Sequence, residues 1–376
     1  MNYFVIIFVF LSQIAAAQGD YLIRQVKLFD GFFTREKVDV LIKDGIIQSI
    51  GTLKSTDLQG ATVISGEGRT IIPGLVNCHV HAWLPYHLKN AMQSGVFAVL
   101  DMHTSIHPDS LDKYQLEDGY ARFYSTGYAA TVKEGHGTQY GFRVSTIGEN
   151  RTPSQFVRES AARGSDYIKI IYEPQRPTLS VKQVTEIIAA SKTEGLLTIA
   201  HISRIGNARD LINTGLDGFA HMWKDAPASQ LFLDSIANQE IFIVPTISVM
   251  EGVIKYYREN DIPVPFSDLA TLKLEVKRLQ DAGIALLAGT DPPNVGLDYG
   301  SSLHNELKLF VEGGLTPIQA LKAATSTPNK VFNLGEIGVI EVGTSANFTL
   351  IDGDPLERIE EISQIQSIWA GGKKIK

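Results

Sequence analysis

Eight short apolar runs, separated by polar loops and helix-like segments, are the feature that most limits how this chain can fold. They begin after Pro73, and their alternation with amphipathic segments is typical of parallel strands joined by helices. Eight such units are the number that closes a (β/α)8 barrel. The sequence therefore predicts an α/β protein whose main domain is a TIM barrel over residues 74–334. Its strands are expected within residues 74–80, 96–102, 128–132, 167–172, 196–200, 218–220, 241–249 and 284–288.

Three segments between these runs carry the signature of a helix start. Each has a Ser or Thr followed three residues later by Gln, which is a capping box in which each side chain bonds the other residue's backbone N–H. Two of the three also have Pro at the first helical position, where its missing N–H costs nothing. Helices are therefore expected to begin at Thr152–Gln155, Ser180–Gln183 and Thr316–Gln319.

Short alternating strands with turns occupy both ends of the chain. Asp44-Gly45 between two apolar runs is a strong hairpin signal. Strand-like runs return after Leu334 and continue to the last residues. We expect residues 18–73 and 335–376 to form one small composite β-sandwich domain beside the barrel.

The first seventeen residues differ from the rest of the chain. An unbroken apolar run from Phe4 to Leu11 leads to the small residues Ala15-Ala16-Ala17. Such a segment is typical of a secretory signal peptide and is too short for a membrane span of about 20 residues. We expect residues 1–17 to be a signal peptide, with an uncleaved anchor as the alternative. The mature chain would then be secreted across the inner membrane, to the periplasm or outside the cell, with no membrane span.

The composition narrows the chemistry that the chain can support. A single cysteine excludes an intramolecular disulfide and any multi-cysteine metal site. With 34 Lys and Arg against 41 Asp and Glu, the net charge of −7 gives no basis for binding nucleic acid. A metal site would have to use the nine histidines and the carboxylates.

Several histidines fall at the carboxyl ends of the predicted barrel strands, where barrel enzymes place their chemistry. His79 and His81 are two residues apart at the end of the first strand, so both side chains face the same way. His201, His221 and Asp291 end the fifth, sixth and eighth strands. Imidazole is a preferred ligand for zinc-like ions, and a carboxylate beside a metal site can act as a general base. The sequence therefore predicts a hydrolytic metal site made of these five residues.

Lys169 lies in the middle of the predicted fourth strand, in Tyr167-Ile168-Lys169-Ile170. A charged lysine inside a barrel is costly to bury unless it is paired or chemically altered. Its ammonium has no lone pair for a metal. A purely structural alternative is an ion pair with Asp101 or Asp291.

These residues resemble the amidohydrolase superfamily, in particular its imidazolonepropionase-like and Xaa-Pro-dipeptidase-like (prolidase-type) metal-dependent hydrolases. The resemblance rests on three segments of the barrel and one of the C-terminal region, and it covers essentially the whole chain after the signal peptide. In the C-terminal region the usual Ala-Asp is replaced by Ala346-Asn347. The segments are residues 73–81, 164–170, 289–291 and 343–356.

The resemblance implies two divalent metal ions, with Zn2+ favoured and Mn2+, Fe2+ or Co2+ as alternatives. It implies that His79, His81 and Asp291 hold one ion and that His201 and His221 hold the other. Lys169, carboxylated on its amine by CO2, would bridge them. A hydroxide shared by the ions would attack the substrate, and Asp291 would pass its proton to the leaving amine.

Substrate contacts are predicted at three further positions. His136 follows the third strand and is expected to touch the scissile carbonyl group, while Tyr172 could donate to the oxyanion. Arg204 is a candidate for binding a substrate carboxylate. Where related peptidases carry a glycine-rich loop after the bridging lysine, this chain has Tyr172-Glu173-Pro174-Gln175-Arg176. His103 and His304 are expected to be structural.

The sequence thus favours a secreted amidohydrolase that cleaves the C–N bond of a small linear or cyclic amide. An Xaa-Pro-type dipeptidase is the first alternative, and a lactonase or esterase using the same site is another. A non-catalytic scaffold would be expected to lack some of the metal ligands, whereas here all six positions are filled. The substrate is a small molecule, and the sequence leaves a homo-oligomer open.

Overall fold

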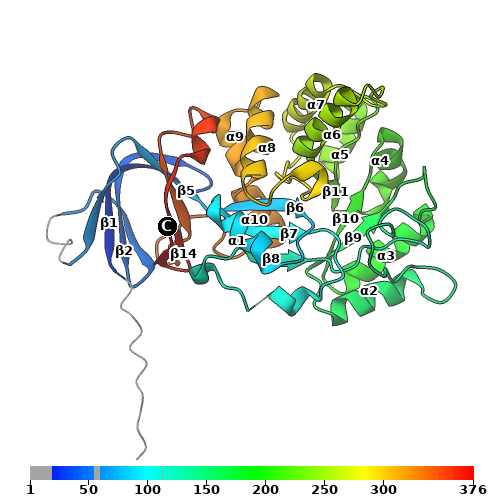
Figure 1. Ribbon diagram of the computed structural model, residues 1–376, viewed down its shortest axis with the longest axis horizontal. Helices are drawn as coiled ribbons and strands as arrows, with labels where there is room; N and C mark the ends of the chain where they lie inside the picture. Colours follow the sequence, from blue (N-terminus) through cyan, green and yellow to red (C-terminus); the bar gives the residue numbers. More distant parts are fainter. Residues whose placement is uncertain (1–18, 55–59, 112) are drawn as a thin grey trace, which may run out of the picture.

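The computed structural model describes residues 19–54, 60–111 and 113–376. The predicted signal peptide lies outside these ranges. Figure 1 shows two regions: strands from the two ends of the chain gather on one side, and parallel strands surrounded by helices form the other. Within the described residues, no helix is both long enough and apolar enough to cross a membrane.

Both chain ends contribute to one eight-stranded sheet. Its order is β15-β14-β13-β5-β1-β2-β3, and β4 pairs with β1 outside this path. The sheet buries an apolar cluster that includes Ile23, Val40, Phe348 and Trp369. The strands are β1 (Tyr21–Phe29), β2 (Thr34–Lys43), β3 (Ile46–Gly51), β4 (Thr62–Ser65), β5 (Arg69–Pro73), β13 (Phe348–Asp352), β14 (Ile365–Ala370) and β15 (Lys373–Lys374).

The hairpin predicted at Asp44-Gly45 is confirmed. These two residues connect the antiparallel strands β2 and β3, and both have positive φ values, 49° and 80°. A two-residue turn with positive φ at both positions matches the twist of the strands that it joins, and Asp-Gly is one of the few pairs that adopts it readily.

Two parallel sheets form the second region. One has the order β6-β7-β8 and the other β12-β11-β10-β9. Their strands are almost fully buried, as expected for parallel sheets covered by helices. The strands are β6 (Leu75–Val80), β7 (Val96–Asp101), β8 (Arg122–Ser125), β9 (Tyr167–Ile171), β10 (Leu197–His201), β11 (Gly218–Ala220) and β12 (Phe242–Val244).

Hydrogen bonds outside the named strands connect the two parallel sheets at both edges. On one side, Ala130 N donates to Lys169 O (2.7 Å), which links the segment after β8 to β9. On the other, Leu286 bridges Ile243 of β12, and Cys78 N of β6 donates to Ala288 O (2.8 Å). Residues 284–288 therefore lie between β12 and β6.

The third strand differs from the prediction. The strand paired with β7 is β8 at Arg122–Ser125, whereas the expected segment 128–132 forms only isolated bridges, through Ala130 and Val132. The chain bends after Ser125 at Gly127, which has φ = 63°, so one continuous strand cannot cover both segments. The predicted eighth segment, 284–288, likewise makes one isolated bridge.

Ten α-helices of the described residues accompany these strands, and the three predicted capping boxes are all formed. Thr152, Ser180 and Thr316 each accept from the backbone N–H of the Gln three residues later. The helices are α1 (Pro85–Gln93), α2 (Pro153–Ala162), α3 (Val181–Thr193), α4 (Ile205–Leu211), α5 (Gln230–Asn238), α6 (Ile247–Glu259), α7 (Leu269–Asp281), α8 (Ser301–Glu312), α9 (Pro317–Ala323) and α10 (Ser326–Phe332).

Helix α6 begins in an unusual way. The residue before it, Thr246, has φ = 53° and its side chain does not cap the helix. Instead, the fully buried carboxylate of Glu306 on α8 accepts from the backbone N–H groups of Ile247 (2.9 Å) and Ser248 (2.7 Å). A negative charge at a helix N-terminus is favourable, although burial raises the pKa of Glu306 to about 7. Glu306 therefore fixes where α6 starts.

Replacing Glu306 with Ala should lower the free energy of unfolding by about 2 kcal/mol, because two buried N–H groups lose their acceptor. Glu312→Ala on the same helix is the matched control. Glu312 pairs with Lys273 near the surface, and such a pair contributes ~0.5 kcal/mol. Urea unfolding of both variants measures the difference, and equal losses would contradict the capping role of Glu306.

Candidate metal centre

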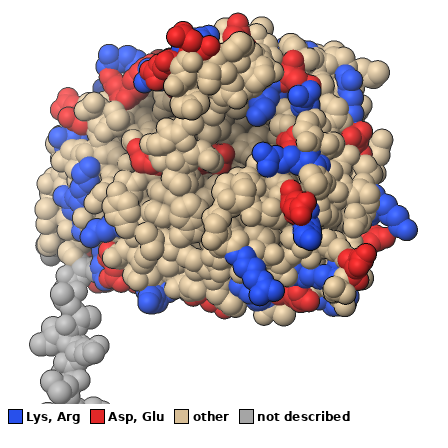
Figure 2. All heavy atoms as spheres, turned by 45° about the vertical axis from the view of Figure 1, so that its right-hand side comes forward, with Lys and Arg blue, Asp and Glu red and all other residues tan. Residues whose placement is uncertain are grey.

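The carboxyl ends of the parallel strands surround a cavity of about 340 Å3. Figure 2 shows the face of the molecule that is hollowed, with basic side chains beside the opening. The lining includes all six residues predicted as metal ligands and the predicted substrate contact His136. Those six are His79, His81, Lys169, His201, His221 and Asp291.

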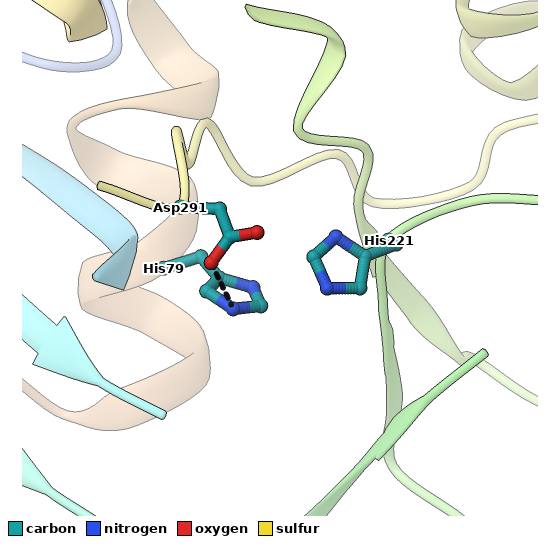
Figure 3. Close-up of side chains that lie close together, drawn as sticks. All are labelled: His79, His221 and Asp291. Atoms are coloured by element: carbon teal, nitrogen blue, oxygen red, sulfur yellow. Dashed lines mark ion pairs between the residues drawn. The ribbon is translucent and has the colours of Figure 1, made fainter. Parts of the chain in front are cut away.

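Asp291 lies close to His79 and His81, the two histidines with which it is predicted to hold one metal ion. Its Oδ1 atom is 3.1 Å from His81 Nε2 and 3.4 Å from His79 Nε2. One ligand atom from each of His79, His221 and Asp291 lies within 4.8 Å of the others, a spacing that a single metal ion could span. Figure 3 shows these three side chains turned toward one another from different elements. The prediction assigns His221 to the second metal ion, together with His201. In the structure, His221 also lies close to His79 and Asp291.

Hydrogen bonds fix the ring orientation of two of these histidines. His81 Nδ1 lies 3.2 Å from the backbone O of His103, and since a carbonyl only accepts, the proton is on Nδ1 and the Nε2 lone pair is free. His221 Nδ1 lies 2.6 Å from Thr246 Oγ1. Such partners are typical of metal-ligating histidines, because they set the tautomer and the direction of the free nitrogen.

The backbone is strained at the same edge of the sheets. His221, Thr246 and Asp291 follow β11, β12 and segment 284–288, and their φ values are 68°, 53° and 62°. Non-glycine residues rarely adopt positive φ, and each instance costs of order 1 kcal/mol. Because the strain recurs at the ends of three neighbouring segments, it indicates that these residues are kept in one fixed arrangement for a functional reason.

Burial favours the uncharged form of most histidines in the cavity. It lowers the pKa of His79 and of His221 well below the usual value, and nearby Lys169 lowers both further. A neutral imidazole is the form that coordinates a metal. His81 differs, because the negative charges of Asp291 and Asp101 outweigh burial and raise its pKa.

Lys169 is the basic group inside this cluster. Its side chain is buried on β9, and desolvation lowers the pKa of its amine to about 7 despite the opposing charges of Asp291 and Asp101. No ion pair of 4.0 Å or less joins Lys169 to a carboxylate among the described residues. The ion pair considered as a structural alternative is therefore not formed.

Two buried polar atoms of the cluster are unsatisfied. Among the residues that the structure describes, His79 Nδ1 and Asp291 Oδ1 are shielded from solvent and have no hydrogen-bond partner. Leaving such atoms unpaired costs about 1–3 kcal/mol each, so native proteins rarely tolerate them without a ligand. Imidazole nitrogens and a carboxylate oxygen are the donor set that zinc-like ions bind. The residues present therefore fit a metal ion.

His136 lies next to His201, one of the two histidines predicted to hold the second metal ion. Its ring stacks on that of His201 at a centroid distance of 4.6 Å. Gln139 Nε2 is 3.4 Å from His136 Nδ1, and since an amide NH2 only donates, the ring proton lies on Nε2. Burial lowers the pKa of His136 to about 3, so the ring is neutral and can donate one hydrogen bond.

The structure places the other two predicted substrate contacts elsewhere. Tyr172 is buried in the core, and its hydroxyl donates to Asp210 Oδ2 (2.9 Å). Arg204 is exposed at the start of α4. Neither residue is among the described residues that line the cavity. The structure therefore does not support Tyr172 or Arg204 as a substrate contact.

Several cavity residues were not found from the sequence. Lys224 and Tyr140 line the cavity. Glu173 is not part of the lining, but its Oε2 atom lies 3.6 Å from His201 Nε2. Helix α6 adds Val249 and Met250. These residues lie in loops or on a helix, where neither strand periodicity nor ligand spacing marks them. Only the position of Lys224, three residues after the ligand His221, could have drawn attention to it.

Comparison with known proteins identifies the family. The profile of the Amidohydrolase family matches residues 70–375, which is most of the chain. The chain belongs to the amidohydrolase family. The resemblance inferred from the sequence is thereby confirmed, and the protein is a hydrolase of this family with a candidate metal site.

Individual relatives of this amidohydrolase are distant. It is 24% identical to a 5'-deoxyadenosine deaminase of Methanosarcina mazei, over 84% of this chain and 80% of the relative. It is 22% identical to an imidazolonepropionase of Alkaliphilus oremlandii, over 84% and 83% of the two chains. A putative prolidase from Bifidobacterium longum has the same α/β fold, with a TM-score of 0.78, 19% identity and coverage of 96% and 95%.

Thr246→Val should weaken metal binding by about tenfold to a hundredfold, because it removes the hydroxyl that fixes the His221 ring while keeping the side-chain shape. Thr246→Ser retains the hydroxyl and should bind close to wild type. Titration of the metal-free protein with Zn2+ measures the effect. If the Val variant binds as tightly as the Ser variant, the Thr246 hydroxyl does not orient His221.

Proposed function

We propose that this amidohydrolase is a metal-dependent enzyme that cleaves the C–N bond of a small amide with water. The observation that carries the proposal is the position of Asp291, with its carboxylate 3.1 Å from His81 and 3.4 Å from His79 inside a cavity that also contains Lys169. Hydrolysis of an amide needs an activated water and a proton for the departing nitrogen. Together with the proposed metal ions, Asp291 would activate the water, and Asp291 would also pass the proton to the departing nitrogen.

The architecture that we propose is a closed TIM barrel over residues 74–334. The hydrogen bonds from β6 to segment 284–288 and from the segment after β8 to β9 support closure on both sides. Residues 18–73 and 335–376 would form the second domain. The shared sheet of β1–β5 and β13–β15 supports its composite origin.

We propose two divalent metal ions, Zn2+ by preference, held by His79, His81, His201, His221 and Asp291. The unsatisfied Oδ1 atom of Asp291, 3.4 Å from His79 Nε2, supports coordination at one end of the cluster. His201 lies at the other end, with its ring 4.8 Å from that of His221. When bound, such ions would lower the pKa of a water molecule to about 7 and polarise a carbonyl group.

Lys169 would take part as a carbamate. A protonated ammonium would repel the metal ions, but burial brings the pKa of this amine to about 7, so a neutral fraction exists at neutral pH. The neutral amine adds CO2, forms an N–C bond and releases one proton. The product is an anionic oxygen ligand at the position where the ammonium was unfavourable.

The protein side chains divide the reaction between them. Asp291 takes the proton from the attacking water and delivers it to the nitrogen that leaves, which its position beside His79 and His81 supports. His136 donates from Nε2 to the carbonyl oxygen, where negative charge develops. The uncharged state of His136 suits a hydrogen-bond donor, because the ring does not have to lose a proton.

Lys224 favours a substrate whose leaving part carries a carboxylate. Its half-buried side chain lines the cavity and interacts electrostatically with the carboxylates of Glu173 and Asp291. Its ammonium group lies 5.4 Å from the centroid of the Phe266 ring. A desolvated cation can pair with a substrate carboxylate more strongly than an exposed one. This observation keeps a dipeptidase, including the Xaa-Pro type, as the second candidate, whereas a lactone or other ester would not use Lys224. The enzyme would work in the periplasm or outside the cell if residues 1–17 are a signal peptide.

The zinc-loaded protein should hydrolyse N-acyl amino acids and dipeptides faster than the corresponding carboxamides, because only the former carry the carboxylate for Lys224. Release of the free amine is measured across a library that includes lactones and aminopurine nucleosides. If ammonia from the nucleosides is the main product, as the named activity of the Methanosarcina relative would suggest, the proposed reaction is wrong.

Lys169→Ala should lose both bound metal and at least about a hundredfold in activity, since a bridging ligand to both ions is removed. Lys182→Ala, on the exposed face of α3, is the control for the loss of a lysine. Metal content by plasma emission and the rate of amide hydrolysis are measured together. A Lys169→Ala variant with full activity would show that Lys169 is not a bridge.

A further inference from the structure

A second, smaller pocket opens beside the metal centre. Its volume is about 130 Å3, and it shares His81, His103 and Asn294 with the main cavity. Its other walls are aromatic or apolar and are provided by Trp83, Tyr140, Phe142 and Pro293, of which Tyr140 also lines the main cavity. We call these four residues and the space that they enclose the side pocket.

The dimensions of the side pocket suit one planar ring. An apolar cavity of roughly 150 Å3 is large enough to bind benzene. The Tyr140 ring lies 6.3 Å from His81 and 6.0 Å from His103, and the Phe142 ring lies 5.1 Å from His103. These wall rings contact one another at the distances that aromatic pairs prefer, so they form a packed aromatic surface against which a ligand ring can lie.

Trp83 contributes its ring, but not its indole N–H, to this pocket. Its indole Nε1–H is shielded from solvent and has no hydrogen-bond partner among the described residues. A buried donor of this kind costs about 1–3 kcal/mol unless an acceptor is supplied. Because this N–H is shielded even from a water-sized group, the Trp83 ring can offer the side pocket its apolar face but not its donor.

The Trp83 ring is held in place by residues outside the pocket. Its backbone N–H donates to His87 Nδ1 (3.1 Å), and the His87 ring stacks on Tyr299 at 4.1 Å. The Tyr299 hydroxyl donates to the backbone O of His81 (2.7 Å). The ligand His81 and the side-pocket residue Trp83 are therefore positioned by the same chain of contacts.

We propose that the side pocket binds an aromatic or heteroaromatic ring in the acyl part of the substrate. The assignment rests on the proposed function, in which Lys224 takes the carboxylate of the leaving part and leaves the side pocket for the acyl part. The substrate class is then an N-aroyl or N-heteroaroyl amino acid.

The test compares kcat/KM for N-acetyl-, N-benzoyl- and N-nicotinoyl-L-alanine. The wild-type enzyme should prefer the benzoyl over the acetyl substrate by about tenfold or more, because the ring is buried on binding. The nicotinoyl substrate carries a ring of the same size and should show the same preference over the acetyl substrate. Equal rates with the acetyl and benzoyl substrates would overturn the proposal.

Two variants separate the contributions of the Trp83 ring. Trp83→Ala should abolish the preference for both aromatic substrates, and an unchanged preference would refute the assignment. Trp83→Phe keeps an aromatic wall and should keep most of the preference for both aromatic substrates. Leu84→Ala removes an exposed side chain one residue away and should keep all the preferences of the wild type.

Ligand-detected NMR with benzamide, nicotinamide and acetamide tests the pocket without catalysis. Both aromatic amides should bind the wild-type protein and lose affinity in Trp83→Ala, while acetamide should not distinguish the two proteins. If none of the amino-acid derivatives is hydrolysed but the aromatic amides bind in this way, the proposed reaction fails and the side pocket stands. If the aromatic amides bind no better than acetamide, the side pocket proposal fails.

Discussion

The hydrogen bonds between β6 and the segment that starts at residue 284 are the constraint on which the site depends. Cys78 N donates to Ala288 O, and Asp291 N donates to His79 O, both at 2.8 Å. The buried side chain of Asn77 strengthens the same connection through Thr290 Oγ1 (2.7 Å). These contacts join the first and last parallel segments of the region, and they bring the Asp291 carboxylate beside His79 and His81.

The walls of the cavity depend on buried carboxylates contributed by helices farther along the chain. Glu306 on α8 accepts from the first N–H groups of α6, which carries Val249 and Met250 into the cavity. Glu275 on α7 accepts from Trp223 Nε1 (2.9 Å) and Ala228 N (2.8 Å), in the loop that follows His221. Buried charges are costly, but here each is bonded to backbone or side-chain N–H groups and so fixes a loop that bears functional residues.

The sequence was most informative where strand periodicity applies. His79 and His81 share one face of β6 because they are two residues apart. His201, His221 and Asp291 were found because each follows an apolar run. The role of Lys169, in the middle of its strand, came only from the family resemblance. Strand periodicity also explains why Tyr172 lies outside the cavity. It is three residues from Lys169, an odd spacing that turns its side chain to the opposite face, whereas Ile171, two residues away, lines the cavity.

Other features could not be read from local patterns. The strand β8 is short and ends at a bend, and the apolar segment that follows it has the sequence pattern of a strand without forming one. Lys224, Tyr140 and Trp83 reach the cavity and the side pocket from loops, whose course depends on tertiary contacts. The pairing of His221 with Thr246 crosses between the ends of β11 and β12, and no sequence spacing indicates it.

The most direct test of the account is anomalous diffraction at the zinc edge from crystals of the zinc-loaded protein. Two peaks are predicted, one near His79, His81 and Asp291 and the other near His201 and His221. The density of Lys169 should extend into a carboxylate group between them. A single peak with an unmodified Lys169, or no peak in this cavity, would contradict the proposed two-metal centre.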